Sequence, residues 1–217
     1  KELIFEIVGE INLEIINQET EELIPIKLTK ELVREKYLKN YTPIIINCVN
    51  SIDKIGVING LWANAIGNGG IIQIECMYYI SSTLFDLKLT GRQGDVMKES
   101  MNVAKNLAWS LLNSEEQTKS RENYSESQLQ GIHIHAPEAA TPKDGPSAGT
   151  AITVALYSLF SNKPINHKIA ITGEINLSGQ ITAIGGLDLK IIGGIRAGVT
   201  QFIFPKENIH EYNKFLT

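Results

Sequence analysis

The 217-residue chain has only two cysteines, Cys48 and Cys76, and their spacing does not suit a metal site. A fold held together by several disulfides is excluded, because two cysteines form one bridge at most. We expect two buried free thiols in a reducing compartment. One disulfide between them is the alternative.

The chain also has no long hydrophobic run and no excess of basic residues. The apolar runs at residues 44–48 and 71–74 are far shorter than the roughly 20 residues that a membrane helix needs. A signal-peptide pattern is not found at the start. The formal net charge of −4 gives no reason to expect nucleic-acid binding, and no Walker lysine loop occurs, so we do not expect ATP to bind here. With 43% hydrophobic and 20% charged residues, the composition is that of a globular domain.

The most informative stretch that is present, TPKDGPSAGT at residues 141–150, puts one serine just before an apolar helical pattern. A helix start has unpaired amides and the positive end of the helix dipole, and both stabilise an oxyanion. The pattern therefore predicts an acyl-transfer nucleophile at Ser147. Two alternatives stay open here. Ser147 is only an N-cap, or the loop Gly145–Gly149 binds a phosphate, which Asp144 disfavours by repelling the anion.

A second stretch, residues 172–198, has two short alternating strands and then a helix that opens at a Gly-Gly pair. Lys190 lies in the first turns of this helix. Burial among apolar neighbours lowers the pKa of a lysine, because it disfavours the charged form. We therefore expect Lys190 to serve as a general base. Its apolar neighbours are Leu187, Leu189, Ile191 and Ile192.

The chain divides by pattern into a helical start and a larger body. Residues 1–17 carry an amphipathic helical stripe, and a second short helix begins at Thr29 and ends near Pro43. Short β-rich runs, a long helix and a polar segment follow, and residues 113–130 are typical of a flexible surface connection. Strand, helix, strands, helix and strand complete one α+β domain. The first strands are expected at residues 44–49, 56–61, 71–79 and 84–89, and the apolar side of the long helix is Val96, Val103, Leu107, Leu111 and Leu112.

Together the two stretches resemble the proteolytic domain of Lon proteases, which are ATP-dependent serine proteases with a serine-lysine dyad. Residues 137–149 resemble the nucleophile motif of that family, and residues 172–190 resemble its lysine motif. Ser147 and Lys190 are 43 positions apart, which is the family's separation. The resemblance covers roughly residues 55–208. It implies peptide hydrolysis through an acyl-enzyme, with Ser147 as nucleophile and Lys190 as base.

The resemblance also implies an organisation and partners. Residues 1–42 resemble the end of the helical part of the family's ATPase module, and residues 43–217 resemble a C-terminally truncated proteolytic domain. We expect a homo-hexamer that degrades unfolded or damaged polypeptides, with ATP and Mg²⁺ in an ATPase module that this sequence lacks. For these residues we expect no cofactor, metal, nucleic acid or membrane.

Two further questions are left with alternatives. The mitochondrial matrix is the expected compartment, and the bacterial cytoplasm is the alternative. A Lon-like domain that serves only as an inactive scaffold is the rival function. The presence of both Ser147 and Lys190 argues against it.

Three residues are expected to support the dyad. Thr172 would hydrogen-bond the neutral Lys190 amine, a role that the resemblance also assigns to it, and its alternative is a strand residue whose hydroxyl binds backbone. Asp144 would cap the loop or steer Lys190, unless it only forms the turn. His135 supports the site or only packs, and it shares one side of a strand with His133. We expect neither a metal pair nor a histidine base there, because no third ligand lies at a suitable spacing.

Overall fold

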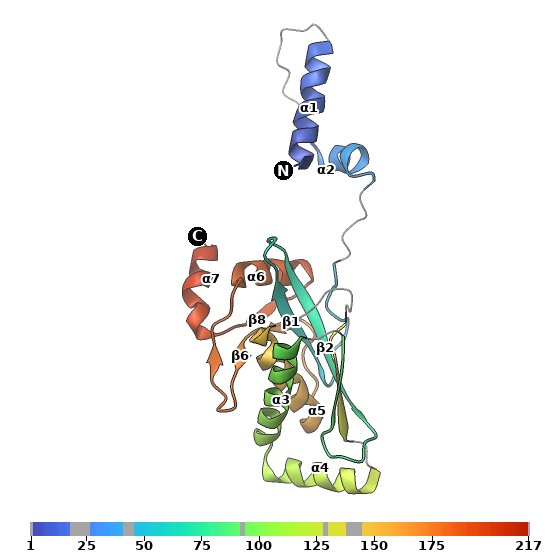
Figure 1. The fold of residues 1–217 in the computed structure, drawn as a ribbon, viewed down its shortest axis with the longest axis vertical. Helices are drawn as coiled ribbons and strands as arrows, with labels where there is room; N and C mark the ends of the chain where they lie inside the picture. Colours follow the sequence, from blue (N-terminus) through green and yellow to red (C-terminus); the bar gives the residue numbers. More distant parts are fainter. Residues whose placement is uncertain are drawn as a thin grey trace. The chain divides into compact units, whose positions relative to one another are not determined.

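The structure, a computed structural model, describes residues 2–17, 27–40, 46–91, 94–127, 130–137 and 145–216. The chain divides into two compact units, Lys1–Ile45 and Ile46–Thr217, which Figure 1 colours along the sequence. The domain boundary expected between residues 42 and 43 falls outside the described residues, so it stays a prediction.

The first unit contains helical segments only, among its described residues. The predicted helix start at Thr29 is confirmed, because its Oγ1 accepts a hydrogen bond from the backbone N–H of Leu32 at 3.2 Å. An ion pair of 3.0 Å joins Lys36 to Glu10 in the first helix. The elements are α1 (Glu2–Asn17), α2 (Lys30–Leu32) and a π-helical turn, η1 (Val33–Tyr37).

The second unit is built on a mixed six-stranded sheet and a separate two-stranded hairpin. Its strands are β1 (Val57–Ala63), β2 (Gly69–Tyr79), β3 (Leu87–Thr90), β4 (Gly131–His135), β5 (Ile169–Ile171), β6 (Glu174–Ile175), β7 (Ile181–Thr182) and β8 (Gln201–Ile203). The strand order of the sheet is β3-β4-β2-β1-β5-β8, and β6 pairs with β7. The long strand β2 pairs antiparallel with both β1 and β4, whereas β3–β4, β1–β5 and β5–β8 are parallel pairs.

Helices cover both faces of this sheet (Figure 1). Alternation along β1 sends Ile58 to one face, where α3 (Asp95–Ser110) and α5 (Gly149–Ser161) pack, and Leu61 to the other. The second face receives α6 (Leu187–Arg196), which packs on β1 and β2. The remaining elements are α4 (Ser114–Ser127), α7 (Ile209–Leu216) and the 3₁₀ turns η2 (Pro146–Ala148) and η3 (Lys206–Asn208). The α+β class expected from the sequence is confirmed.

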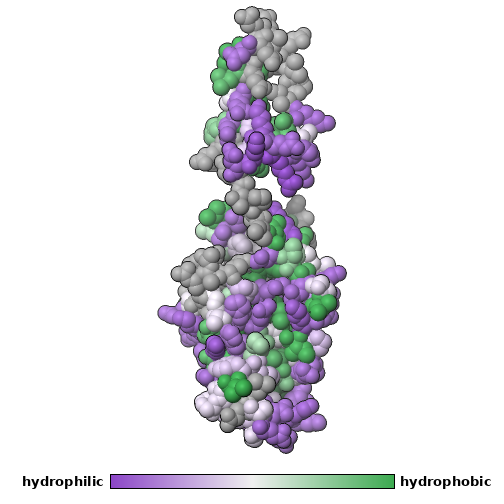
Figure 2. Space-filling model, turned by 90° about the vertical axis from the view of Figure 1, so that its right-hand side faces the viewer, coloured by the Kyte–Doolittle hydropathy of each residue, from purple (hydrophilic) through white to green (hydrophobic). Residues whose placement is uncertain are grey.

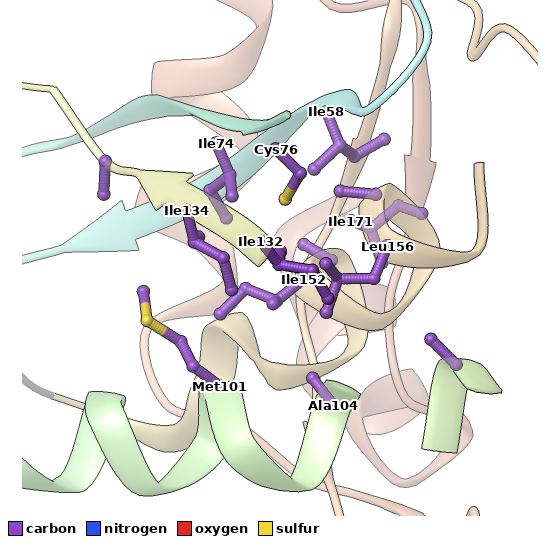
Figure 3. Close-up of a cluster of buried hydrophobic side chains, with 14 of the residues drawn as sticks. Ile58, Ile74, Cys76, Met101, Ala104, Ile132, Ile134, Ile152, Leu156 and Ile171 are labelled. Carbon is purple, nitrogen blue, oxygen red and sulfur yellow. The ribbon is translucent and has the colours of Figure 1, made fainter. Parts of the chain in front are cut away.

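The main hydrophobic core lies between the sheet and the pair α3 and α5. Figure 3 shows side chains from these elements pointing toward one another across this layer. Each fully buried aliphatic side chain stabilises the fold by about 1.5 to 3 kcal/mol, so this layer fixes α5 firmly against the sheet. The labelled members are Ile58, Ile74, Cys76, Met101, Ala104, Ile132, Ile134, Ile152, Leu156 and Ile171.

Both cysteines are free thiols, as the sequence predicts. Cys76 is buried in the core, and burial raises the pKa of its thiol. Cys48 is exposed, so its expected burial is wrong.

Several predicted elements are confirmed with shifted ends, and two expectations are wrong. Strands at residues 57–63 and 69–79 and the helix from residue 95 agree with the sequence patterns. Residues 46–50 form no strand, contrary to the expectation for residues 44–49. Val96 and Leu111 are exposed, so the expected apolar side of α3 is partly wrong. The buried face of α3 is instead Met97, Met101, Ala104, Leu107 and Ala108.

The polar segment after α3 is a helix, α4, where we expected a flexible connection. A capping box begins it: Asn113 Oδ1 accepts from the N–H of Glu116 at 2.8 Å, and Glu116 Oε2 accepts from the N–H of Asn113 at 3.1 Å. Tyr124 Oη then donates to the carbonyl of Ser82 at 2.6 Å. Local capping and this tertiary contact replace the apolar stripe that the sequence pattern requires.

The surface of the larger unit mixes polar and apolar side chains. Figure 2 shows separate apolar patches among polar ones on one face of it. Among the described helices, none is long and apolar enough to cross a membrane.

Candidate active site

Ser147 lies in the 3₁₀ turn η2 that leads directly into α5. Its carbonyl oxygen accepts hydrogen bonds from the N–H of Gly173 at 2.8 Å and from Thr172 Oγ1 at 3.2 Å. Neither the helix nor the turn is capped by the Ser147 side chain, because Ala148 and Gly145 occupy the two N-cap positions. The N-cap interpretation of Ser147 is therefore wrong, and its hydroxyl is directed elsewhere.

The start of α5 is tied to the chain that follows β5. Thr150 donates twice to the carbonyl of Gly173, from its backbone N–H at 3.1 Å and from its Oγ1 at 2.9 Å. A Cβ at Gly173 would stand 2.7 Å from Thr150 Oγ1, so only glycine allows this approach. These bonds hold the turn that carries Ser147 in register with Thr172.

Lys190 projects from the first turns of α6 toward that turn. Its Nζ donates to Ser147 Oγ at 3.3 Å and to Thr172 Oγ1 at 3.2 Å, and the residue is only 4% exposed. Burial lowers the pKa of Lys190 to about 8, and the charge of Glu211 offsets part of that effect. The structure therefore brings together Ser147 and Lys190, which are 43 positions apart.

Thr172 connects Lys190 to the turn that carries Ser147. It is 1% exposed and lies directly after β5. A hydroxyl has one proton and two lone pairs, so Thr172 donates to the Ser147 carbonyl and still accepts from Lys190. Both sequence interpretations of Thr172, a lysine partner and a hydroxyl that binds backbone, describe part of this geometry.

The depth of Lys190 depends on Gly186, from the Gly-Gly pair that the sequence pattern marked, and on two glycines that the sequence did not single out. The helix α6 begins after Gly186, whose φ of +66° suits glycine. A Cβ at Gly193 would stand 2.1 Å from the backbone carbon of Gly69, the first residue of β2. The helix and the strand therefore meet backbone to backbone.

The two histidines of β4 lie on the same side of their strand, as the alternation predicts. Thr90 Oγ1 lies 2.9 Å from His133 Nε2 and 2.7 Å from His135 Nδ1. Burial, followed by the charges of Lys88 and His135, lowers the pKa of His133. The described hydrogen bonds of this pair reach neither Ser147 nor Lys190, so both expectations for His135, a supporting role and packing alone, stay predictions.

Two other expectations about the site concern Asp144 and metals. Asp144 lies outside the described residues, and its proposed role stays a prediction. Among the side chains that the structure describes, no group of three or more His, Cys, Asp and Glu residues could hold a metal ion.

Sequence comparison places the chain among known proteases. Residues 30–215 match the family model of the Lon protease (S16) C-terminal proteolytic domain. The chain is 40% identical over 190 residues to a Lon protease homolog of Acanthamoeba polyphaga mimivirus, a match that covers 85% of this chain and 18% of that protein. It is 40% identical over 166 residues to the Lon protease of Clostridium acetobutylicum, with 76% and 20% covered. It is 45% identical over 154 residues to the Lon protease of Borrelia duttonii, with 70% and 18% covered.

The chain thus spans about a fifth of the length of these curated relatives. The family model covers most of the sequence, including the turn of Ser147 and the helix of Lys190. The resemblance stated from the two motifs is confirmed. This chain belongs to the family of Lon protease (S16) C-terminal proteolytic domains.

Proposed function

We propose that this chain is the proteolytic part of an ATP-dependent serine endopeptidase, with Ser147 as nucleophile and Lys190 as general base. The 3.3 Å contact between Lys190 Nζ and Ser147 Oγ, made by a buried lysine, carries this proposal. A serine hydroxyl is a poor nucleophile at neutral pH and needs an adjacent base.

Burial makes Lys190 available as that base. A lysine with an ordinary pKa of 10.5 is about 0.03% neutral at pH 7, whereas a pKa of about 8 makes it about 10% neutral. The neutral fraction therefore rises about 300-fold. The neutral amine keeps two N–H groups and one lone pair. Donation to Thr172 leaves the lone pair for the Ser147 proton.

The reaction that follows from this arrangement has two steps, acylation of Ser147 and hydrolysis of the resulting ester. Lys190 takes the hydroxyl proton while Ser147 Oγ attacks the peptide carbonyl carbon, and the resulting ammonium then protonates the leaving amine. An ester between Ser147 and the acyl part of the substrate is left. Lys190 next takes a proton from water, the hydroxide attacks the ester, and the proton returns to Ser147 Oγ.

The start of α5 supports stabilisation of the oxyanion. Ser147 lies where the turn η2 enters a 13-residue helix, so a carbonyl attacked by Ser147 would lie near the positive end of the helix dipole. One well-placed donor to the oxyanion lowers the barrier by roughly 3 to 4 kcal/mol.

We further propose that the substrates are unfolded or damaged polypeptides and that the working form is a homo-hexamer. The family membership supports protein substrates. ATP and Mg²⁺ would act in an ATPase module outside this sequence, which has no Walker lysine loop. We propose the bacterial cytoplasm as the compartment, rather than the mitochondrial matrix, because the relatives named above come from bacteria and a virus.

The test compares peptide cleavage by the chain with that of two serine variants. Cleavage of fluorogenic peptides is expected from the wild type and from Ser125→Ala, which changes an exposed serine on α4. Ser147→Ala is expected to lose at least 100-fold in rate. If no form cleaves peptides, even when joined to an ATPase module and assembled into a ring, the inactive scaffold is the better account.

A further inference from the structure

The segment after β8 holds the loop that leads into α6. Glu207 Oε2 accepts from the N–H of Ala183 at 2.8 Å. Asn208, which is buried, makes two bonds to Ile184, since its Oδ1 accepts from the N–H at 3.0 Å and its Nδ2 donates to the carbonyl at 2.7 Å. Side chains of η3 thus fix the path of residues 183–184, which lie a few positions before α6.

Glu211, on the first turn of α7, reaches the helix itself. Its Oε1 accepts from the N–H of Leu187, the first residue of α6, at 2.9 Å, and its Oε2 accepts from Asn208 Nδ2 at 3.0 Å. The N-cap residue of α6 is Gly186, which has no side chain to bond the free amides of the first turn. Glu211 therefore supplies the cap from a different helix, 24 positions along the chain.

The same carboxylate acts on Lys190, which follows Leu187 by one turn. The hydroxyls that contact Lys190 Nζ, from Ser147 and Thr172, are neutral. The negative charge of Glu211 raises the pKa of Lys190, against the larger lowering by burial. The charged groups on the elements that pack most against α6 are Glu75 on β2, Asp188 and Arg196 on α6 itself, and His210, Glu211 and Lys214 on α7, with none on β1.

We propose that Glu211 is a positioning residue for Lys190: it caps the helix that carries the lysine and stabilises the ammonium that forms when the lysine takes the serine proton. This inference rests on the proposed function. A carboxylate at this place has two opposing effects. It keeps more of the resting lysine protonated, but it makes the neutral amine a stronger base.

The test measures the titration of Lys190 directly, so it does not depend on peptidase activity. The side-chain signal of Lys190, in protein with isotope-labelled lysine, is assigned by its absence from Lys190→Met and followed by NMR from pH 6 to 11. Glu211→Gln keeps the cap acceptor and removes the charge, and its Lys190 midpoint is expected at lower pH than in the wild type. Glu207→Gln is the matched control, because the Glu207 carboxylate also bonds a backbone N–H of the loop before α6 but makes no described contact with α6 itself. The Lys190 midpoint of Glu207→Gln is expected to be the same as in the wild type.

A kinetic arm follows the rate of Ser147 acylation by a serine-reactive peptide probe against pH. Glu211→Gln is expected to shift the rising limb to lower pH and to lower the plateau about three-fold, because a weaker base assists less. Glu211→Asp keeps the charge and is expected to restore most of the plateau. If Glu211 is only a structural cap, both glutamine variants would change in stability and the Lys190 midpoint would be unchanged in both. That result would overturn the proposal.

Two outcomes separate this inference from the proposed function. A lower Lys190 midpoint in Glu211→Gln would support the coupling between Glu211 and Lys190. If the wild type and all variants also show no acylation of Ser147, the peptidase proposal is contradicted while the coupling stands. If Glu211→Gln does not fold, the wild type still decides, because the N–H of Leu187 must then show an inflection near the midpoint of Lys190. A flat response of that amide across the titration overturns the coupling.

Discussion

The carbonyl of Leu189 lies directly against Gly69: a Cβ on Gly69 would stand 2.1 Å from the Leu189 oxygen. The next residue after Leu189 is Lys190, so the backbone that carries this buried lysine touches the first residue of β2. Gly193, one turn further along α6, makes the second close approach to the same strand. Two glycines on the two elements therefore set how deeply Lys190 lies.

Gly193→Ala is expected to destabilise the larger unit. The added methyl would stand 2.2 Å from the carbonyl oxygen of Gly69 and 2.3 Å from the nitrogen of Gly70, so backbone must move. Forced repacking of this kind costs about 1 to 3 kcal/mol. Urea unfolding measures the loss. Gly185→Ala is the control, since a Cβ there meets nothing within 4 Å, and an equal loss in both variants would contradict the packing argument.

Lys190→Met is expected to be more stable than the wild type at pH 7, by up to about 3 kcal/mol, which is a pKa difference of about 2.5 converted to free energy. The pKa of Lys190 is lower in the folded state, so the wild type carries the full penalty below pH 8. The penalty disappears as the pH rises from about 8 to 10.5, because the unfolded lysine then also loses its proton. Urea unfolding at several pH values measures the difference in the free energy of unfolding between the two proteins. A difference that grows from pH 8 to 10.5 would contradict a lowered pKa of Lys190 in the folded state.

Thr172→Val is expected to slow acylation of Ser147 by at least 10-fold. Valine has a similar volume but removes both the acceptor for Lys190 and the donor to the Ser147 carbonyl. Thr172→Ser keeps the hydroxyl and is expected to recover most of the rate. The second-order rate with a serine-reactive peptide probe gives the comparison. Equal rates in the valine and serine variants would contradict a role for the Thr172 hydroxyl, because only the serine variant keeps it.

His135→Gln is expected to change acylation by less than three-fold while lowering stability by about 1 kcal/mol, the worth of an ordinary hydrogen bond. The reason is that the imidazole lies against Thr90, on the strands β3 and β4. Parallel rate and denaturation measurements separate the two effects. A loss of acylation as large as that of Thr172→Val would instead give His135 a supporting role at the site.

The sequence predicted the parts of the site that lie in local motifs. A glycine-proline turn before an apolar helix located Ser147, and a lysine among aliphatic residues at the start of a helix located Lys190. Thr172 was also found, because it begins the second motif. Local rules about turns, helix starts and burial marked Ser147 and Lys190, and the resemblance to the Lon family supported the roles given to all three residues.

The parts that the sequence did not predict depend on contacts between distant segments. Glu211 caps α6 from 24 positions away, and no local pattern marks it. Gly69 and Gly193 are ordinary glycines until the strand and the helix are placed together. The helix α4 was missed for a related reason: its sequence is almost wholly polar, and the cap at Asn113 and the contact of Tyr124 define it instead.

The most direct test of the dyad is the site and pH dependence of covalent modification. A serine-reactive peptide probe is incubated with the chain, alone and joined to an assembled ATPase module, and the adduct is mapped by mass spectrometry. We expect one adduct, on Ser147, forming at a rate that rises through about pH 8, and at least 100-fold more slowly in Lys190→Met. An adduct on another residue, or a Ser147 rate unchanged by the loss of Lys190, would contradict the account.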